Sequence, residues 1–468
     1  MTAYSESPNL VGEAEPGEEP VHAPVAEIFG EVADASIPAA VSMPEEPPVD
    51  AKAPRKSSFI SKGFWAVTDQ GLFAGSNAVL IWMLAIWLSP DDFGAFSTAF
   101  AAFLAVGVVH TAILTEPMLV FAPDRYRNNL KQYLGALLYG HIVVSIVFGI
   151  LIAVAALVLQ VQGQYAVAKA LYCFAAASPF ILFLWLMRRA CYAQLNPRRA
   201  ALSGFGYLVL MMSALFIVHQ LHMLNFVSAL AMLGGSSAVV GIYLSVGQMQ
   251  VRGLPREFLK DVVMQHWRYG LWASATQVLG YIPGNIYYFL LPKMASLADS
   301  GALRAISNLF NPFVQANSAL CLILLPTFVR THGTPEGKRM HRLALLVLAG
   351  GPFIYWIILG VANHKIVDLV YHHQYLQYSS LIWIIGFQPV IAGMCGVYGS
   401  LLRAKQKMNA VFWGGVVAAV AAVTLGVAMT KWYGMAGVCW SIVITYGLHH
   451  ITLWAFSRSY SKEKPSVA

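Results

Sequence analysis

Two stripes of polar side chains run through apolar stretches in the second half of the chain. The first stripe holds four residues spaced by four, three and four positions, Arg304, Asn308, Asn311 and Gln315. The second stripe holds Gln277, Tyr281, Asn285 and Tyr288. Each spacing places its side chains on one face of a helix. Such a face serves either to bind a polar cargo or to form interhelical hydrogen bonds, worth about 0.6 kcal/mol each.

Polar and titratable side chains also interrupt the apolar stretches near the start of the chain. Asp69 and Asn77 lie in the first stretch, and His110 and Glu116 lie in the second. A charge at the centre of a membrane costs about 2.5–3.5 kcal/mol, which favours a functional role for the two carboxylates and for Arg304. Arg304 also lies near a predicted membrane edge, where a long side chain can snorkel to water.

The two carboxylates are expected at a similar depth, because Asp69 begins one helix and Glu116 ends the next on the same side of the membrane. Arg125 and Arg127 follow closely and could pair with either acid. We assign Asp69, Glu116 and Arg125 to gating or coupling. The residues alone leave open whether they form a cytoplasmic gate lock or a site for a coupling proton or cation.

The elements that position these side chains are transmembrane helices. The chain has 468 residues, of which 58% are hydrophobic and 11% charged, and its mean hydropathy is +0.61. A soluble protein could not hide so much apolar surface, whereas apolar runs of about 20 residues match a bilayer. The sequence predicts an all-α polytopic membrane protein with twelve spans, at roughly 65–88, 93–120, 134–158, 166–187, 200–218, 224–247, 267–291, 303–329, 343–361, 378–402, 411–429 and 435–457.

The distribution of basic residues predicts the orientation of these spans. With a cytoplasmic start, the inside segments hold 25 of the 30 Lys and Arg residues. This is a strong positive-inside bias, and it places both termini in the cytoplasm.

The chain divides into four predicted parts. Residues 1–62 form an acidic, Pro-rich cytoplasmic tail that is expected to be disordered, since they hold nine prolines and 11 acids against 4 bases. Residues 63–248 and 265–468 form two six-helix lobes, joined by a cytoplasmic linker at 249–264. Span starts in the second lobe trail those in the first by 202 to 212 residues. Six helices preserve orientation, so the lobes form a parallel repeat around a central cavity.

Enzyme and metal-site patterns are absent from the sequence. It contains no P-loop lysine motif, no zinc-binding His-Glu motif and no nucleophile elbow. The adjacent pairs His372-His373 and His449-His450 diverge on a helix and cannot chelate one ion alone. The positive charge follows membrane topology, so a nucleic-acid surface is a poor interpretation. We expect no cofactor and no catalytic residues.

A turn and its flanking helices carry a family resemblance. The stretch Asp69-Gln70-Gly71-Leu72-Phe73-Ala74-Gly75-Ser76-Asn77, followed by Leu88-Ser89-Pro90-Asp91-Asp92-Phe93-Gly94-Ala95-Phe96, resembles bacterial polysaccharide-biosynthesis flippases of the MOP (multidrug/oligosaccharidyl-lipid/polysaccharide) exporter superfamily. The stretch Thr115-Glu116-Pro117-Met118 and the following Asp124-Arg125-Tyr126 are similar to one Gram-negative branch. The resemblance covers residues 63–460.

This resemblance implies a V-shaped MOP-type fold with a polar or cationic cavity between spans one, two, seven and eight. The implied cargo is a polyprenyl-pyrophosphate-linked glycan that crosses the bacterial inner membrane for exopolysaccharide or O-antigen (lipopolysaccharide) biosynthesis, with a polysaccharide polymerase and glycosyltransferases as partners. Basic and amide groups would bind its phosphates and hydroxyls, and Tyr281, Tyr287 and Tyr288 would stack on sugars. The candidate cavity residues are Asn77, His110, Gln277, Tyr281, Asn285, Tyr288, Arg304, Asn308, Asn311 and Gln315.

Two other functions compete with the flippase. A multidrug or metabolite antiporter of the same superfamily would be driven by Na⁺ or H⁺ through Asp69 or Glu116. A membrane ligase for polyprenyl-linked sugars would need a long outside loop, and no predicted outside loop exceeds about 17 residues at typical span lengths. The turn motif and the lack of a dense acid cluster in the first lobe favour the flippase.

Overall fold

The computed structural model describes residues 56–331 and 333–462, so most of the predicted acidic tail lies outside the described residues. The first helix of the described residues, α2, begins at Lys56, seven residues before the predicted lobe boundary at residue 63. Its last residue is Trp87, one residue before the predicted end of span one.

Eight helical segments build the first lobe. They are α2 (Lys56–Trp87), α3 (Pro90–His110), the π-helix η1 (Thr111–Thr115), α4 (Glu116–Phe121), α5 (Leu130–Val161), α6 (Tyr165–Ala193), α7 (Pro197–Gln220) and α8 (Phe226–Ser245), with a short 3-10 turn, η2 (Arg127–Asn129), before α5. Segments α3, η1 and α4 together form one crossing, because the helix continues through the π-helical turn.

The second lobe follows the same plan with more interruptions. Its segments are α9 (Arg256–Asn285), α10 (Tyr287–Met294), α11 (Leu297–Asn308), α12 (Asn311–Arg330), α13 (Pro335–Leu345), η3 (Leu346–Gly350), α14 (Gly351–Val361), α15 (Asn363–Tyr371), η4 (Leu376–Leu381), α16 (Ile382–Ile385), α17 (Gln388–Ala404) and α18 (Met408–Lys462).

The number of crossings agrees with the predicted twelve. Ten helical stretches of the described chain are long and apolar enough to span a membrane. One of them, α18, contains two helices that meet at Gly434, whose φ of 55° only glycine adopts easily. Span seven, α9 with α10, is not among those ten, because polar residues occur along α9 and the helix is interrupted between Asn285 and Tyr287. The predicted all-α architecture of two six-helix lobes is confirmed.

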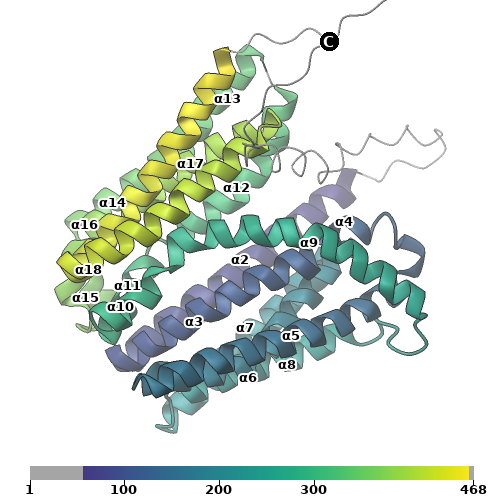
Figure 1. Ribbon diagram of the computed structural model, residues 1–468, viewed down its shortest axis with the longest axis horizontal. Coiled ribbons are helices and arrows are strands. Elements are labelled where there is room, and N and C mark those ends of the chain that lie inside the picture. The colour runs from purple at the N-terminus through teal and green to yellow at the C-terminus, as the bar shows by residue number, and fades with distance from the viewer. Residues whose placement is uncertain (1–55, 332, 463–468) are drawn as a thin grey trace, which may run out of the picture. The chain divides into compact units, whose positions relative to one another are not determined.

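The two lobes meet at the end that carries the Ser89-Pro90 turn. Helix α11 lies against α3 (Figure 1), and a Cβ on Gly94 would overlap the carbonyl oxygen of Leu297. The hydroxyls of Thr98 and Ser300 lie 3.1 Å apart across this contact. Seven consecutive residues of α11, from Ser300 to Ile306, are buried. This end of the interface between the lobes is therefore closed.

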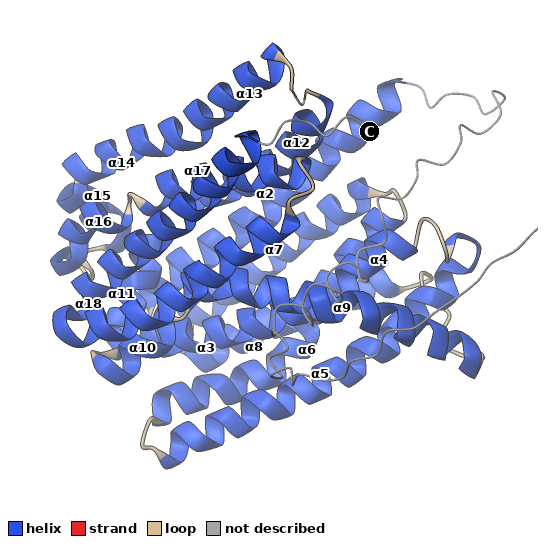
Figure 2. Ribbon diagram, turned by 45° about the horizontal axis from the view of Figure 1, so that its top comes forward, coloured by secondary structure: helices blue, strands red, loops and turns tan. Residues whose placement is uncertain are grey.

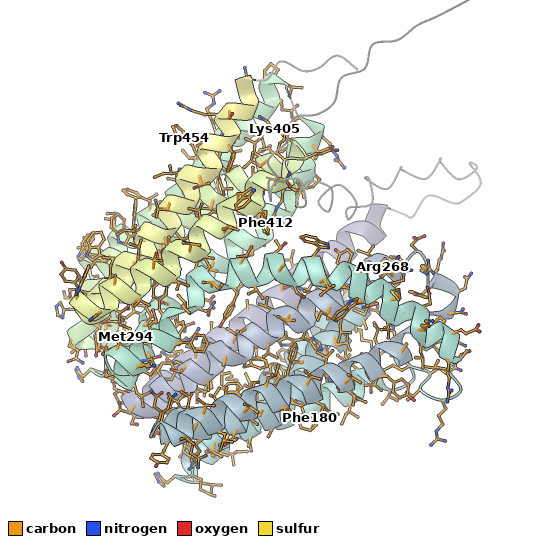
Figure 3. The ribbon with its side chains drawn as sticks, viewed as in Figure 1. Phe180, Arg268, Met294, Lys405, Phe412 and Trp454 are labelled. Carbon is orange, nitrogen blue, oxygen red and sulfur yellow. The ribbon has the colours of Figure 1, made fainter. Side chains whose placement is uncertain are left out.

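At the other end the second lobe contacts the first through α9, whereas α12 packs within its own lobe. Helix α12 packs mainly on α17 and α13 of its own lobe, and most of its residues are exposed or half-buried. Figure 2 shows α12, α13 and α17 at the end away from α10 and α11. Met294 lies at the closed end and Lys405 lies at the opposite end of the second lobe (Figure 3). Helix α9 packs against helices of both lobes, since it contacts η1 and α3 as well as α18.

Candidate functional site

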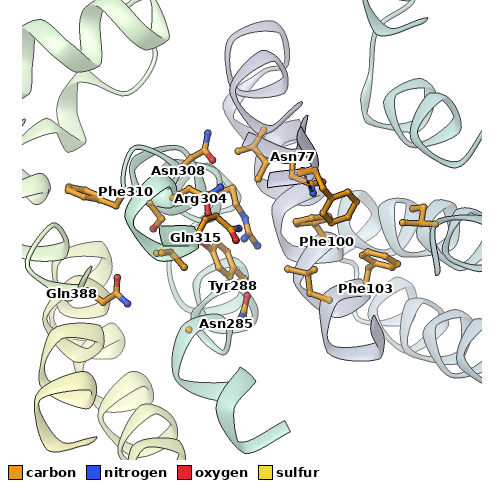
Figure 4. A pocket seen from close by; sticks show the side chains of 18 of the residues that line it. Asn77, Phe100, Phe103, Asn285, Tyr288, Arg304, Asn308, Phe310, Gln315 and Gln388 are labelled. Carbon is orange, nitrogen blue, oxygen red and sulfur yellow. Dashed lines mark hydrogen bonds between the residues drawn. The ribbon is translucent and has the colours of Figure 1, made fainter. Parts of the chain in front are cut away.

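A cavity of about 440 Å³ lies between the lobes, and most of the predicted cavity residues line it (Figure 4). Those that line it are Asn77, Asn285, Tyr288, Arg304, Asn308, Asn311 and Gln315. The first stripe therefore stays together across the break between α11 and α12. Their shared position supports, as a hypothesis, their predicted role in holding cargo.

Three predicted cavity residues lie elsewhere. His110 is fully buried inside the first lobe, where its Nε2 lies 2.9 Å from His141 Nδ1. Gln277 donates a hydrogen bond to Glu116, and Tyr281 donates one to the carbonyl of Ala101. The helix face that we predicted from spacing on span seven turns partly toward the first lobe, because α9 packs on α3 and η1 there.

The predicted stacking tyrosines also separate. Tyr288 lines the cavity, whereas Tyr287 is fully buried with its hydroxyl 3.2 Å from Ser441 Oγ. Consecutive residues of a helix point about 100° apart, so only one of the two can face the cavity.

Arg304 is the only charged side chain among the described residues that line the cavity. Its guanidinium lies 3.7 Å from the ring centroid of Tyr288 and 5.4 Å from that of Phe100, and its Nη2 donates to the carbonyl of Ser97 at 3.1 Å. Its Nε is buried without a hydrogen-bond partner. Aromatic faces and one carbonyl stabilise this cation but leave its charge uncompensated, so the cavity attracts anions.

Three amides of the cavity use their NH₂ groups in hydrogen bonds to backbone carbonyls, which leaves their oxygens to the cavity. Asn308 donates through Nδ2 to the carbonyl of Ala78 at 3.1 Å, and its Oδ1 is buried without a partner. Asn77 and Asn285 likewise donate to backbone carbonyls of their own helices. With the amide orientations assigned in this way, these residues offer acceptors, which suit hydroxyl groups of a cargo.

Aromatic side chains of the first lobe form the wall across from the second-lobe residues Arg304 and Asn308, and none of them was among the predicted cavity residues. Phe100 and Phe103 stack with centroids 6.0 Å apart, and Trp185 meets Phe103 edge-on at 5.6 Å. Phe73 adjoins Trp185. Their signal in the sequence is weak, since aromatic residues inside spans are common core residues. The cavity thus has one polar wall and one aromatic wall.

Asp69 forms a buried ion pair inside the first lobe. Arg188 Nη2 lies 2.7 Å from Asp69 Oδ1, and the Tyr192 hydroxyl donates to Oδ2 at 2.7 Å. The Arg188 guanidinium also lies 3.9 Å from the centroid of Phe73, a residue of the cavity wall. Neither Arg125 nor Arg127 is the partner of this acid.

Arg125 pairs with Asp261 near the start of α9. Its Nη2 lies 2.7 Å from Asp261 Oδ1, and the Tyr126 hydroxyl donates to Oδ2 at 2.8 Å. Although burial opposes it, these hydrogen bonds and the arginine charge hold the pKa of the Asp261 carboxyl below its usual value. Arg125 therefore links α9 to the first lobe, which corrects the expected pairing with Asp69 or Glu116.

Sequence comparisons give one partial match, whereas comparisons with solved structures show the fold. No family model matches the chain. A curated relative, lipopolysaccharide biosynthesis protein WzxC of Escherichia coli (strain K12), is 22% identical over 181 residues, which cover 35% of this chain and 37% of that protein. The match thus spans little more than a third of the relative's length.

Two solved structures are similar over most of the chain. One is the inward-facing conformation of a multidrug resistance MATE family transporter of the MOP superfamily, with a TM-score of 0.66, 14% identity and coverage of 86% of this chain and 100% of that one. The other is lipid II flippase MurJ in an inward closed conformation, with a TM-score of 0.65, 12% identity and coverage of 85% and 87%. The predicted resemblance to the MOP superfamily is confirmed at the level of fold.

Proposed function

We propose that this polytopic membrane protein, which has the fold of the MOP exporters, is a flippase for polyprenyl-pyrophosphate-linked oligosaccharide repeat units. The observation that carries the proposal is the uncompensated cation Arg304 in a cavity between two lobes that also holds Asn308, whose buried Oδ1 has no partner. A phosphate of the cargo binds the guanidinium, and sugar hydroxyls donate to the amides. The aromatic wall supports sugar ring faces opposite them.

The arrangement of the lobes supports transport by alternating access. The contact between α3 and α11 closes one end of the interface between the lobes. At the other end α12 packs on α17 and α13 of its own lobe. The distribution of Lys and Arg assigns the open end to the cytoplasm and both termini to the same side. The cargo enters from the inner leaflet of the bacterial inner membrane and leaves after the lobes rock.

A drug or metabolite antiporter of the same superfamily is the alternative, and the solved structures with this fold include both kinds of transporter. Two observations favour the flippase. A cationic drug would meet Arg304 in a cavity whose described lining contains no carboxylate. Asp69 and Glu116 are each held by a neighbouring side chain, Asp69 by Arg188 and Glu116 by Gln277.

The proposed role requires binding and movement of the cargo but no bond cleavage, so we propose a transporter without enzymatic activity. The glycosyltransferases and polymerase that would make and consume the repeat unit belong to the same proposal. Genes for such enzymes next to the gene of this protein would support it.

Deletion of the gene tests the proposal. We expect loss of a surface polysaccharide and accumulation of a polyprenyl-linked glycan on the cytoplasmic face. Complementation with Arg304→Ala should fail, whereas Lys293→Ala, which removes an exposed cation outside the cavity, should restore the polysaccharide. A deletion strain that keeps its polysaccharide and loses only toxin resistance would establish the antiporter instead.

A further inference from the structure

A pair of histidines lies buried inside the first lobe, apart from the cavity. His110 ends α3 and is fully buried, and His141 lies on α5 and is 4% exposed. His110 Nε2 and His141 Nδ1 are 2.9 Å apart, and the two rings stand edge to face. Two neutral imidazoles in direct hydrogen-bond contact share one N–H between them. The pair therefore has a free ring nitrogen that can bind a further proton.

The hydrogen bonds assign the proton of each ring. His110 Nδ1 is buried without a partner. If it carried a proton, it would be an orphan donor, whereas a bare nitrogen there is a less costly unused acceptor. We therefore place the shared proton on His110 Nε2, donating to His141 Nδ1. The His141 Nε2 proton then faces Ser145 Oγ at 3.4 Å.

No charged group within residues 56–331 and 333–462 faces the pair. From α5 the pair meets Ser145, and from α6 it meets the ring of Phe183 and the backbone of Pro179. The titratable groups of the adjoining segments that are named next, one on α4 and one on α9, have partners of their own. Glu116 accepts from Gln277, and His266 bonds to the carbonyl of Ile113 and to the Tyr133 hydroxyl. A second proton on the pair would therefore sit uncompensated in this conformation.

The segment that follows His110 is the surface on which span seven docks. The π-helix η1 begins at Thr111, and its carbonyl at Ile113 accepts from His266 Nδ1 at 2.8 Å. A Cβ on Gly270 of α9 would come within 2.9 Å of Ile113 Cα, so the two backbones pack closely. A movement of η1 that brings an acceptor to His110 Nδ1 would also displace this contact between α9 and the first lobe.

We propose that the His110–His141 pair is the site of a coupling proton, which binds in the conformation closed at the cytoplasmic end and leaves in the cytoplasm-open one. The cytoplasm-open conformation offers no acceptor among the described residues for a second proton, on His110 Nδ1, so in the proposal it has the lower affinity for that proton. By linkage, protonation then favours the closed conformation. Nitrogen ligands suit a proton and not Na⁺, which prefers oxygen.

The test follows the opening of the lobes against pH and needs no cargo. Spin labels at Leu195→Cys and Met408→Cys, exposed residues of the two lobes at the open end, report their separation in liposomes. Between pH 8 and pH 5 the ratio of open to closed protein should fall by up to about tenfold per pH unit. His110→Gln and His141→Gln, which cannot titrate, should abolish this dependence, whereas His449→Gln in the second lobe should keep it.

Other outcomes would overturn the proposal. They are a pH-independent opening of the unmodified chain, or the same pH dependence in His110→Gln and His141→Gln protein. If both variants fail to fold, ¹⁵N-histidine NMR of the unmodified chain decides, because two ring signals must titrate together. The measurement is independent of the cargo, so a failed flippase assay leaves it standing.

Discussion

Arg304 stacks on the face of Tyr288, with its guanidinium carbon 3.7 Å from the ring centroid, and both residues line the cavity. The ring holds the cation without neutralising it, since a π face carries no net charge. A carboxylate at this place would compete with the cargo for the guanidinium, whereas Tyr288 leaves its N–H groups available.

Loss of this ring should weaken transport while insertion stays normal. A cation–π contact contributes about 0.5–2 kcal/mol, so Tyr288→Leu should reduce cargo affinity by about twofold to thirtyfold. Tyr288→Phe keeps the ring face and should retain most activity. Complementation of the deletion strain at matched expression measures both. Equal activity of Tyr288→Leu and the unmodified chain would separate the ring from cargo binding.

The buried pair of Asp69 and Arg188 should dominate the stability of the first lobe. Removing one partner of a buried pair costs about 3–5 kcal/mol, because the other charge is left uncompensated. Asp69→Leu or Arg188→Met alone should lower the unfolding temperature in detergent, and the double variant should recover much of the loss. A double variant as unstable as the sum of the single ones would contradict this assignment.

The contact between Arg125 and Asp261 should weaken in acid. The pKa of Asp261 is lowered in the folded protein, so its contribution to stability is present above the pKa of the unfolded chain and is lost as pH falls through the folded pKa. The difference in unfolding temperature between the unmodified chain and Asp261→Asn should therefore shrink between pH 6 and pH 3. A difference that stays constant over this range would show that the carboxylate charge is not involved.

The close approach at Gly94 should control the closed end of the interface between the lobes. An alanine Cβ there overlaps the Leu297 carbonyl, so Gly94→Ala should separate α3 from α11 and populate the conformation open at that end. Labelling of Ser300→Cys, buried in this contact, by a water-soluble maleimide measures the opening. Gly71→Ala is the matched control, because no atom lies within 4 Å of its added Cβ. Equal labelling of both variants would contradict the prediction.

The sequence predicts the helices better than the faces they present. Hydropathy and the placement of Lys and Arg report the membrane directly, which explains the agreement on crossings. The residues of the stripe from Arg304 to Gln315 do line one cavity, although the helix breaks between α11 and α12. His110 could not be placed in this way, because its position depends on His141, 31 residues away, and on a π-helical turn that shifts the following residues.

Gln277 and Tyr281 show a second limit of prediction from residue spacing. Their spacing correctly places them on a shared helix face, but spacing does not tell which neighbour that face meets. Helix α9 packs on both lobes, so Tyr281 bonds to Ala101 of the first lobe while Asn285, one turn later, reaches the cavity. Only long-range packing decides between such outcomes.

The two walls of the cavity belong to different lobes, with Arg304 and Asn308 in one and Phe103 and Trp185 in the other. In the proposed cycle, a ligand that touches both walls would bridge two bodies that move apart. It would bind most tightly at one separation of the lobes and more weakly as the aromatic rings withdraw from the sugar. Release of the proposed glycan would then follow from the rocking motion and would require no competing ligand.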